Sequence, residues 1–240
     1  GTANECNADR RFGNAEQAAP VEREVRTQAR RMKVLSVNIV ADLHTGEPWT
    51  GSNPETGIDK RPVSHRVQLF DDHVDGDRVI DRKHHGGPYK AVYAYAREDA
   101  QWWEGEIGRA LPHGSFGENL TTNGIDLTNA VIGEQWRIGS AVVQVVQPRI
   151  ACRVFAGFWD RPKLVQEFSD ARRPGVYLAI VTEGDVGAGD AIEVLHRPQH
   201  GVTIATANAA KLGDDDALPH LRGIADLPPS WQEWIDKRLG

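Results

Sequence analysis

Cysteine and methionine are scarce in this chain of 240 residues. It contains two cysteines, Cys6 and Cys152, and a single methionine, Met32. So few cysteines exclude a disulfide framework and a cysteine-rich zinc site. Each thiol therefore has to be judged from its own sequence neighbours.

Long apolar runs and net positive charge are missing as well. No apolar stretch approaches the roughly 20 residues that span a bilayer, and the amino terminus lacks the short apolar core of a secretory signal. We therefore expect a soluble, cytoplasmic protein without a membrane partner. The formal net charge is -6, which argues against duplex nucleic acid as the main partner.

Several enzyme signatures are also absent. The Gly-x-Ser-x-Gly spacing of a nucleophile elbow and the His-Glu-x-x-His zinc motif do not occur, and the glycines at residues 184–189 have the wrong spacing for a dinucleotide or phosphate loop. These absences argue against a serine hydrolase, a zinc protease and a nucleotide-cofactor enzyme. A cysteine hydrolase that pairs Cys152 with His84, His85 or His113 stays open.

The position of Met32 divides the chain near its start. Met32 directly precedes the first strand-like run, residues 33–40, whereas residues 1–31 show no sustained apolar pattern. We interpret Met32 as the natural start and residues 1–31 as a poorly ordered leader or artificial extension. An amphipathic helix over residues 21–31 is the alternative.

From Met32 onward, strand-like runs alternate with turns. Further runs lie at residues 63–70, 117–122, 136–147, 176–182 and 191–196. Helical spacing covers residues 89–107 and 154–169, and Pro162 is expected to interrupt the second helix. The pattern predicts a mainly β domain of the α+β class over residues 32–197, built as a β-barrel with inserted helices. After Arg197-Pro198, residues 198–240 form short helical stretches, which indicates a second, smaller domain.

The segment around Cys152 carries the most chemical information. An apolar strand runs into Gln147-Pro148-Arg149, and Pro148 must end regular strand pairing. Cys152 follows a few residues later, where side chains project into clefts, with Arg149 and Arg153 nearby. Neighbouring guanidinium groups favour a thiolate, which is both a nucleophile and a metal ligand. The spacing alone leaves a buried, inert cysteine equally open.

Two further segments contain polar residues suited to ligand binding. Lys83-His84-His85-Gly86-Gly87 precedes the first predicted helix, where glycines allow close backbone approach and a helix amino terminus favours an anion. Glu118 and Asn119 follow a turn and can hydrogen-bond the edge of a heterocycle. Both segments also allow a purely structural interpretation. The first can be a turn with solvated basic residues, and the second can be a bend in which Glu118 and Asn119 hydrogen-bond backbone groups.

Taken in order, these segments resemble the MOSC family, which is named for its kinship with the carboxy-terminal domain of molybdenum cofactor sulfurases. The likeness rests on four motifs that follow one another as they do in the family. They are Asp81 with His85-Gly86-Gly87 and Ala91-Val92, then Phe116-Gly117-Glu118-Asn119-Leu120, then Gln147-Pro148-Arg149 with Cys152, and finally Gly175-Val176-Tyr177 with Gly184-Asp185-Val186 and Gly189-Asp190.

The resemblance covers about Met32 to Arg197, and the tail to Gly240 is similar to the small three-helix domain of YiiM-like members. The chain departs from the family at one informative position. Ala151 stands where a proline usually precedes the cysteine, so we expect a less rigid loop.

The resemblance implies a barrel cleft that holds the molybdenum cofactor, a pterin whose dithiolene binds molybdenum. Cys152 would be the metal ligand and the catalytic centre, because soft sulfur suits such a redox metal. Pyridoxal phosphate is not expected, since the aminotransferase-like region of full-length sulfurases is missing. The cofactor-binding candidates are Lys83, His85, Gly86, Gly87, Glu118, Asn119, Arg149 and Arg153.

The reaction implied by the resemblance is reductive removal of oxygen from an N-hydroxylated substrate, such as a hydroxylaminopurine base. The sequence has no flavin, haem or iron–sulfur signature, so a reductase needs an external electron-donor protein. A module that carries the cofactor or its sulfur for another enzyme is the alternative, and a domain for protein interaction alone is a third. Trp102, Trp103 and Trp159 allow either core packing or the contact surface of a homodimer.

Overall fold

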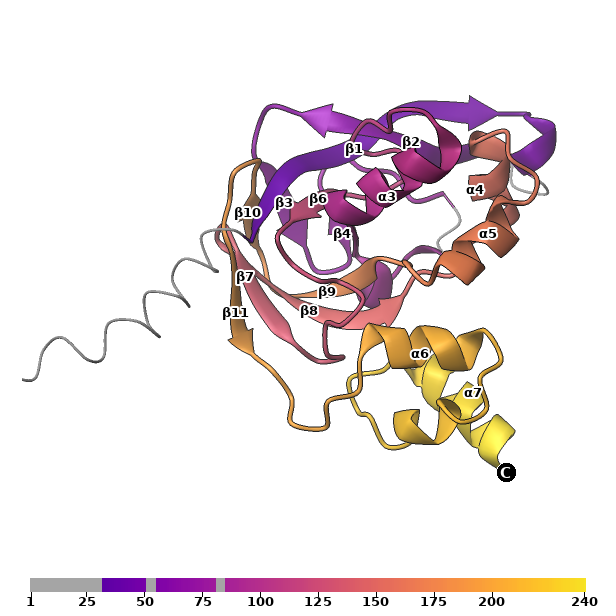
Figure 1. Ribbon diagram of the computed structural model, residues 1–240. Helices are drawn as coiled ribbons and strands as arrows, with labels where there is room; N and C mark the ends of the chain where they lie inside the picture. The colour runs from indigo at the N-terminus through magenta and orange to yellow at the C-terminus, as the bar shows by residue number, and fades with distance from the viewer. Residues whose placement is uncertain (1–31, 51–54, 81–84) are drawn as a thin grey trace, which may run out of the picture.

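The computed structural model describes residues 32–50, 55–80 and 85–240. The predictions made for residues 1–31, Asp81, Lys83 and His84 therefore lie outside the described residues. Within the described ranges, strands dominate the first two thirds of the chain and helices the last part (Figure 1).

An eight-stranded sheet forms the centre of the structure, in the order β11-β7-β8-β9-β5-β6-β1-β2. Neighbouring strands pair antiparallel except for β5 and β6, which are parallel. A smaller sheet contains β10, β3 and β4 in that order. The strands are β1 (Lys33–Thr45), β2 (Glu55–Val63), β3 (Val67–Phe70), β4 (His73–Val74), β5 (Val92–Ala96), β6 (Leu120–Asn123), β7 (Gln135–Ile138), β8 (Ala141–Pro148), β9 (Val176–Thr182), β10 (Gly184–Val186) and β11 (Ile192–His196).

The large sheet is not closed, so the expected barrel is wrong although the α+β class is confirmed. The start of β1 approaches β11, because Lys33 bridges to Ala191 and the Val34 amide donates to the Asp190 carbonyl at 2.9 Å. From Val37 onward β1 pairs with β2, and the register of this pairing is irregular between Val40 and His44. Such irregularities bend a strand. The strand order therefore ends at β2 rather than returning to β11.

The helix predicted over residues 89–107 is correct only in its second half. The first half folds as a short 3-10 helix, η2 (Pro88–Lys90), and the strand β5, before α3 (Arg97–Ile107) begins. All five β5 residues are buried, because the strand lies between β9 and β6 and is covered on both faces. A strand buried on both faces lacks polar alternation, so its apolar residues can imitate helical spacing.

The other predicted elements are confirmed with shifted ends. The run over residues 63–70 belongs to two strands, since β2 ends at Val63 and β3 begins at Val67. The run over 136–147 is the hairpin of β7 and β8. The second predicted helix is divided at Pro162 into α4 (Arg153–Phe158) and α5 (Leu164–Ala171), as expected. A short 3-10 helix, η1 (Pro48–Thr50), contacts α4.

Two hydrophobic clusters meet across β5. Val92 and Ala94 belong to the main cluster, whereas Tyr93 and Tyr95 belong to an aromatic cluster with side chains from α3, α4 and α5. Trp103 and Trp159 are buried in this aromatic cluster, which confirms core packing for both. Trp102 remains 36% exposed.

The carboxy-terminal segment contains α6 (Ile204–Lys211), a 3-10 helix η3 (Leu218–Leu221) and α7 (Pro229–Leu239). Figure 1 shows α6 and α7 beneath the strands of the large sheet. Ile204, Leu221 and Trp231 belong to the same hydrophobic cluster as the sheet. The Trp231 indole donates to Gln147 Oε1 on β8 at 2.7 Å, and Gln144 donates to Asp226 at 2.6 Å. The segment is therefore an extension of the main core, and its independence as a domain stays a prediction.

None of the helices in the described ranges has the length and apolar character needed to cross a membrane.

We predict that Trp231→Ala destabilises the whole fold rather than the tail alone. Trp231 is 4% exposed and its indole binds Gln147. Large-to-small replacement at such a position costs about 3–5 kcal/mol of unfolding free energy. Urea denaturation followed by circular dichroism measures the loss, with Trp102→Ala as the matched control, for which we expect about 1 kcal/mol or less. Equal losses in the two variants would show that the tail does not support the sheet.

Candidate functional site

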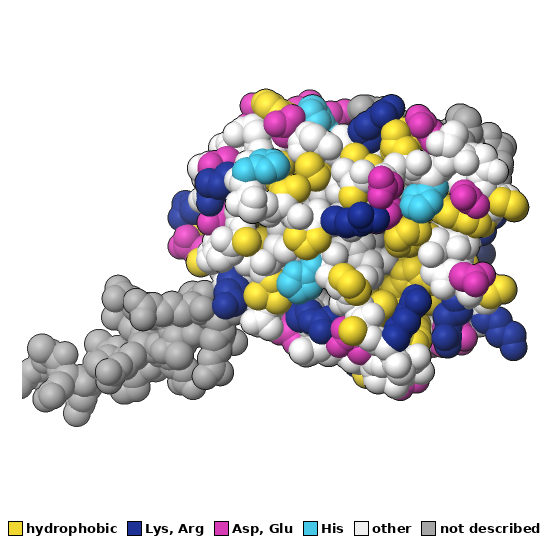
Figure 2. Space-filling model, turned by 90° about the horizontal axis from the view of Figure 1, so that it is seen from above, with side chains coloured by type: hydrophobic (Ala, Val, Ile, Leu, Met, Phe, Trp, Pro, Cys, Tyr) yellow, Lys and Arg dark blue, Asp and Glu magenta, His cyan; other side chains and the backbone are white. Residues whose placement is uncertain are grey.

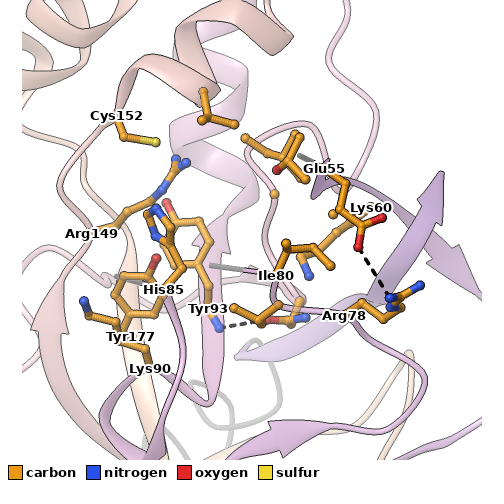
Figure 3. A pocket seen from close by; sticks show the side chains of 17 residues that line it. Glu55, Lys60, Arg78, Ile80, His85, Lys90, Tyr93, Arg149, Cys152 and Tyr177 are labelled. Carbon is orange, nitrogen blue, oxygen red and sulfur yellow. Dashed lines mark hydrogen bonds and ion pairs between the residues drawn. The ribbon is translucent and has the colours of Figure 1, made fainter. Parts of the chain in front are cut away.

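A pocket opens where β2, β5, β9, η2 and the β8–α4 connection converge. Its cavity volume is about 110 Å³, within an opening of about 750 Å³ that includes space open to solvent. Figure 3 shows Cys152, Arg149 and His85 on one side and Lys60, Ile80, Arg78 and Glu55 on the other. The lining residues that carry polar groups are Glu55, Thr56, Lys60, Arg78, His85, Lys90, Tyr93, Asn119, Arg149, Cys152 and Tyr177.

Arg149 is the buried cation of this pocket. The residue is only 5% exposed, and its guanidinium carbon lies 4.2 Å from the Phe155 ring centre and 5.2 Å from that of Tyr93. Among the described residues, Nη1 has no hydrogen-bond partner. A buried charged donor without an acceptor is costly. The pocket therefore offers a hydrogen bond to an anion.

Cys152 stands beside this guanidinium. It is a free, half-buried cysteine in extended conformation at the residue before α4, a few residues beyond the end of β8 as predicted. Figure 3 shows its sulfur next to the Arg149 guanidinium, and the two groups interact electrostatically. The arrangement places a soft sulfur donor and a fixed positive charge on one wall of the pocket.

Lys60 supplies a second buried cation on the opposite side. Its side chain is 8% exposed and forms an ion pair with the Asp77 carboxylate. Burial lowers the pKa of Lys60 from its usual value, although the neighbouring carboxylates of Asp77 and Glu118 act in the other direction. The structure therefore holds an amine that gives up its proton more readily than a surface lysine does.

Asn119 stabilises the pocket wall through the hydrogen bonds of its side-chain amide. Its side-chain oxygen accepts from the Tyr93 amide at 3.1 Å, and its Nδ2 donates to Asp77 Oδ2 at 2.8 Å and to the Asn38 carbonyl at 3.3 Å. These bonds use the hydrogen-bonding capacity of the amide. Asn119 thus lines the pocket, but its side chain connects β5, β1 and the Asp77 loop instead of pointing a vacant group at a ligand.

Glu118 lies behind the wall, outside the pocket lining. Its carboxylate accepts from the amides of Gly114 at 2.6 Å and Phe116 at 2.9 Å and from the Thr121 hydroxyl at 2.8 Å. Burial raises the pKa of Glu118. The turn that it holds needs glycine at position 114, where φ is +90° and a Cβ would lie 2.1 Å from the Lys60 carbonyl. Glu118 therefore fixes the turn that contacts the backbone of Lys60.

The pocket rim reaches the carboxy-terminal segment. Lys90 lines the pocket with its ammonium 6.0 Å from the Tyr177 ring centre. Lys211 of α6 lies 3.5 Å from the Trp234 ring centre, and burial, followed by the charge of Lys90, lowers its pKa to about 8. The two lysines are therefore close enough for their charges to interact, which places α6 next to this wall.

Several predicted binding residues are not brought into the lining. Arg153 is exposed on α4, and neither Gly86 nor Gly87 is among the residues that line the pocket. The element after Gly87 is the three-residue η2 and not the predicted α-helix, so the helix amino terminus expected there is wrong, while anion binding by this segment stays a prediction. Lys83 lies outside the described residues. Within the described ranges, no three His, Cys, Asp or Glu side chains are grouped to hold a metal ion.

Several lining residues were not among the predicted binding residues, and they include Lys60, Tyr93 and Tyr177. Lys60 lies in β2, a polar stretch that carried no strand prediction, and Tyr93 lies in the strand that was predicted as helix. Burial raises the pKa of both tyrosines, so both phenols stay protonated. The segment from Glu55 to Lys60 contains a single apolar side chain, Ile58, so it has no alternation of polar and apolar residues that could have identified β2.

The cations of the pocket are a local feature. On the face shown in Figure 2, Lys and Arg side chains are interspersed with Asp and Glu side chains. Oppositely charged neighbours weaken one another's field beyond a few ångströms. No broad field of one sign therefore covers that face.

The chain is similar to known proteins over most of its length. A model of the MOSC domain matches residues 81–193. The uncharacterized protein YflK of Bacillus subtilis (strain 168) is 36% identical over 215 residues, which cover 87% of this chain and 95% of YflK. Protein YiiM of Escherichia coli (strain K12) is 30% identical over 205 residues, 82% of this chain and 91% of YiiM. The crystal structure of YiiM from Geobacillus stearothermophilus superposes with a TM-score of 0.73 at 28% identity and covers 87% of this chain and 100% of that one.

The chain therefore belongs to the MOSC domain family, as its motifs indicated. Within that family it is YiiM-like in sequence and in fold.

We predict that Glu118→Gln destabilises the protein because the amide offers one acceptor oxygen where the carboxylate offers two. At least one of the donors at Gly114, Phe116 and Thr121 would face an NH2 group. The expected loss of unfolding free energy is about 1–3 kcal/mol, measured by urea denaturation. Glu106→Gln, at an exposed position of α3, is the control and should change it by less than about 0.5 kcal/mol. A neutral result for Glu118→Gln would contradict its role as an anchor.

Proposed function

We propose that the pocket binds the molybdenum cofactor and that the loaded protein reduces N-hydroxylated compounds, such as N-hydroxylated purine bases. Membership of the MOSC family supports the cofactor, since the family is named for its kinship with molybdenum cofactor sulfurases. The observation that carries the proposal is the unpartnered guanidinium nitrogen of Arg149 beside the free Cys152 in one pocket.

The residues of the pocket fit such a group. A phosphate on the pterin would give the Arg149 guanidinium the acceptor that the protein does not provide, and guanidinium groups match phosphate oxygens well. Lys90 contributes further positive charge to the lining. Tyr93 and Tyr177 supply aromatic surface suited to a flat heterocycle. The pocket thus combines anion-binding and ring-binding features.

Cys152 would hold the metal through its sulfur. The described residues contain no group of three ligating side chains, so we infer that the pterin brings the remaining sulfur ligands and the protein adds one. When bound, the cofactor supplies two-electron redox chemistry that side chains lack. The protein binds and orients it, with Asn119 and Glu118 maintaining the wall behind it.

The remaining roles follow from the same proposal. The electrons come from an external electron-donor protein. The predicted cofactor contacts also include Arg153, Lys83, His85 and the Gly86-Gly87 backbone. A homodimer and a cytoplasmic location also stay predictions.

The first test measures molybdenum and pterin content of protein purified from a host that makes the cofactor. We expect the unaltered protein to contain molybdenum at close to one atom per chain, and Cys152→Ser to lose most of it because the sulfur ligand is gone. Cys6→Ser is the matched control and should retain the metal. Equal molybdenum in the Cys152→Ser protein would remove the cysteine from the metal site, and no molybdenum in any of the proteins would overturn the cofactor proposal.

A second test distinguishes an enzyme that turns over substrate from a protein that only carries the cofactor. Loaded protein is mixed with an N-hydroxylated purine and a chemically reduced electron-transfer protein, and the amine product is quantified by chromatography. We expect product to accumulate over many turnovers while the molybdenum stays bound. Absence of product, together with rapid transfer of the cofactor to an apo-enzyme, would support the carrier alternative instead.

A further inference from the structure

The pocket contains a buried amine that the binding proposal does not explain. Lys60 lines the pocket from β2, and Figure 3 shows it across the cavity from Cys152. A cofactor held by Cys152 and Arg149 would occupy the opposite wall. Lys60 therefore faces the space that remains for a substrate.

The Lys60 ammonium is held in place by one partner. Asp77 accepts from it, and Asp77 is itself fixed, because its Oδ1 accepts from the Val40 amide at 3.0 Å and its Oδ2 from Asn119 at 2.8 Å. An ammonium group has three N–H bonds. Among the described residues, Asp77 is the acceptor that the structure gives Lys60, so two N–H bonds can point at a bound molecule.

The tyrosines of the lining are poor proton donors by comparison. Burial raises the pKa of Tyr93 and Tyr177, and the Tyr93 hydroxyl already donates to the Pro174 carbonyl at 2.9 Å. Burial lowers the pKa of Lys60, and the charged groups that face it are Asp77 in the loop after β4 and Glu118 in the turn before β6. A general acid works best when its pKa is near the working pH.

We propose that Lys60 is the proton donor of the reaction and transfers its proton to the hydroxyl oxygen of an N-hydroxylated substrate as the N–O bond breaks. This inference rests on the proposed function. The overall change consumes two electrons from a reduced electron-carrier protein and two protons, and converts R–NH–OH to R–NH2 and water. Lys60 delivers one proton to the departing oxygen, solvent delivers the other, and solvent then reprotonates the Lys60 amine.

The kinetic test compares Lys60→Met and Lys60→Arg with Lys237→Arg, a control at an exposed lysine of α7. Molybdenum content is measured first and should be unchanged in all variants. We expect kcat to fall by about 100-fold or more in both Lys60 variants, with little change in KM, because general acid catalysis contributes on that scale. In the unaltered protein kcat should fall as pH rises through the pKa of Lys60. In Lys60→Arg this fall should be absent, since guanidinium stays protonated.

A second readout needs neither cofactor nor turnover. Lysine amines of the unaltered protein are labelled by reductive methylation with 13C-formaldehyde and titrated by NMR, and the Lys60 signal is assigned by its absence from Lys60→Arg. We expect it to titrate at lower pH than the Lys237 signal. A Lys60 signal that titrates with the exposed lysines would overturn the inference.

The two proposals fail in different ways. Fully loaded, unaltered protein that reduces no N-hydroxylated compound overturns the proposed function and the inference with it. Unaltered protein that turns over, with Lys60 variants that retain its kcat and pH profile, overturns the inference alone.

Discussion

The buried guanidinium of Arg149, held between aromatic rings with one nitrogen unpartnered, is the constraint on which the pocket depends. Contact with aromatic faces recovers part of the cost of burying this charge, on the order of 0.5–2 kcal/mol per favourable ring. The rings come from different elements, Tyr93 from β5, Phe155 from α4 and Phe168 from α5. The aromatic cluster that joins the helices to the sheet is therefore also what positions the cation.

The opposite wall is organised by a different set of contacts. Asp77 joins the Lys60 ammonium to the Asn119 amide, and Glu118 fixes the turn that contacts the Lys60 backbone. The carboxy-terminal segment supports the remaining side through the hydrogen bond between Trp231 and Gln147, whose amide also donates to the Tyr89 carbonyl at 3.0 Å. A pocket built on these long-range contacts depends on the complete fold.

The sequence could predict the part of the site that is local. Arg149 and Cys152 are near neighbours in the chain. Pro148 marks the end of the strand that precedes them, and side chains just beyond a strand end can project into a cleft. Lys60 and Tyr177 reach the same pocket only through the pairing of distant strands, for which one sequence provides no direct signal. Glu118 and Asn119 were identified as polar residues of interest, but only the structure shows that their hydrogen bonds serve the wall. Strand β5 was mistaken for helix because both of its faces are buried.

The most direct test of the central claim is the melting temperature of the cofactor-free protein with and without inorganic phosphate, compared with Arg149→Met and with Arg222→Met, a control at an exposed arginine outside the pocket lining. A ligand that binds the folded state raises the melting temperature. We predict that phosphate raises it in the unaltered protein and in Arg222→Met but not in Arg149→Met. We also expect Arg149→Met to fold stably, since an apolar side chain of similar length replaces a buried charge. An equal phosphate effect in well-folded Arg149→Met would contradict the claim that this guanidinium is the anion-binding group of the pocket.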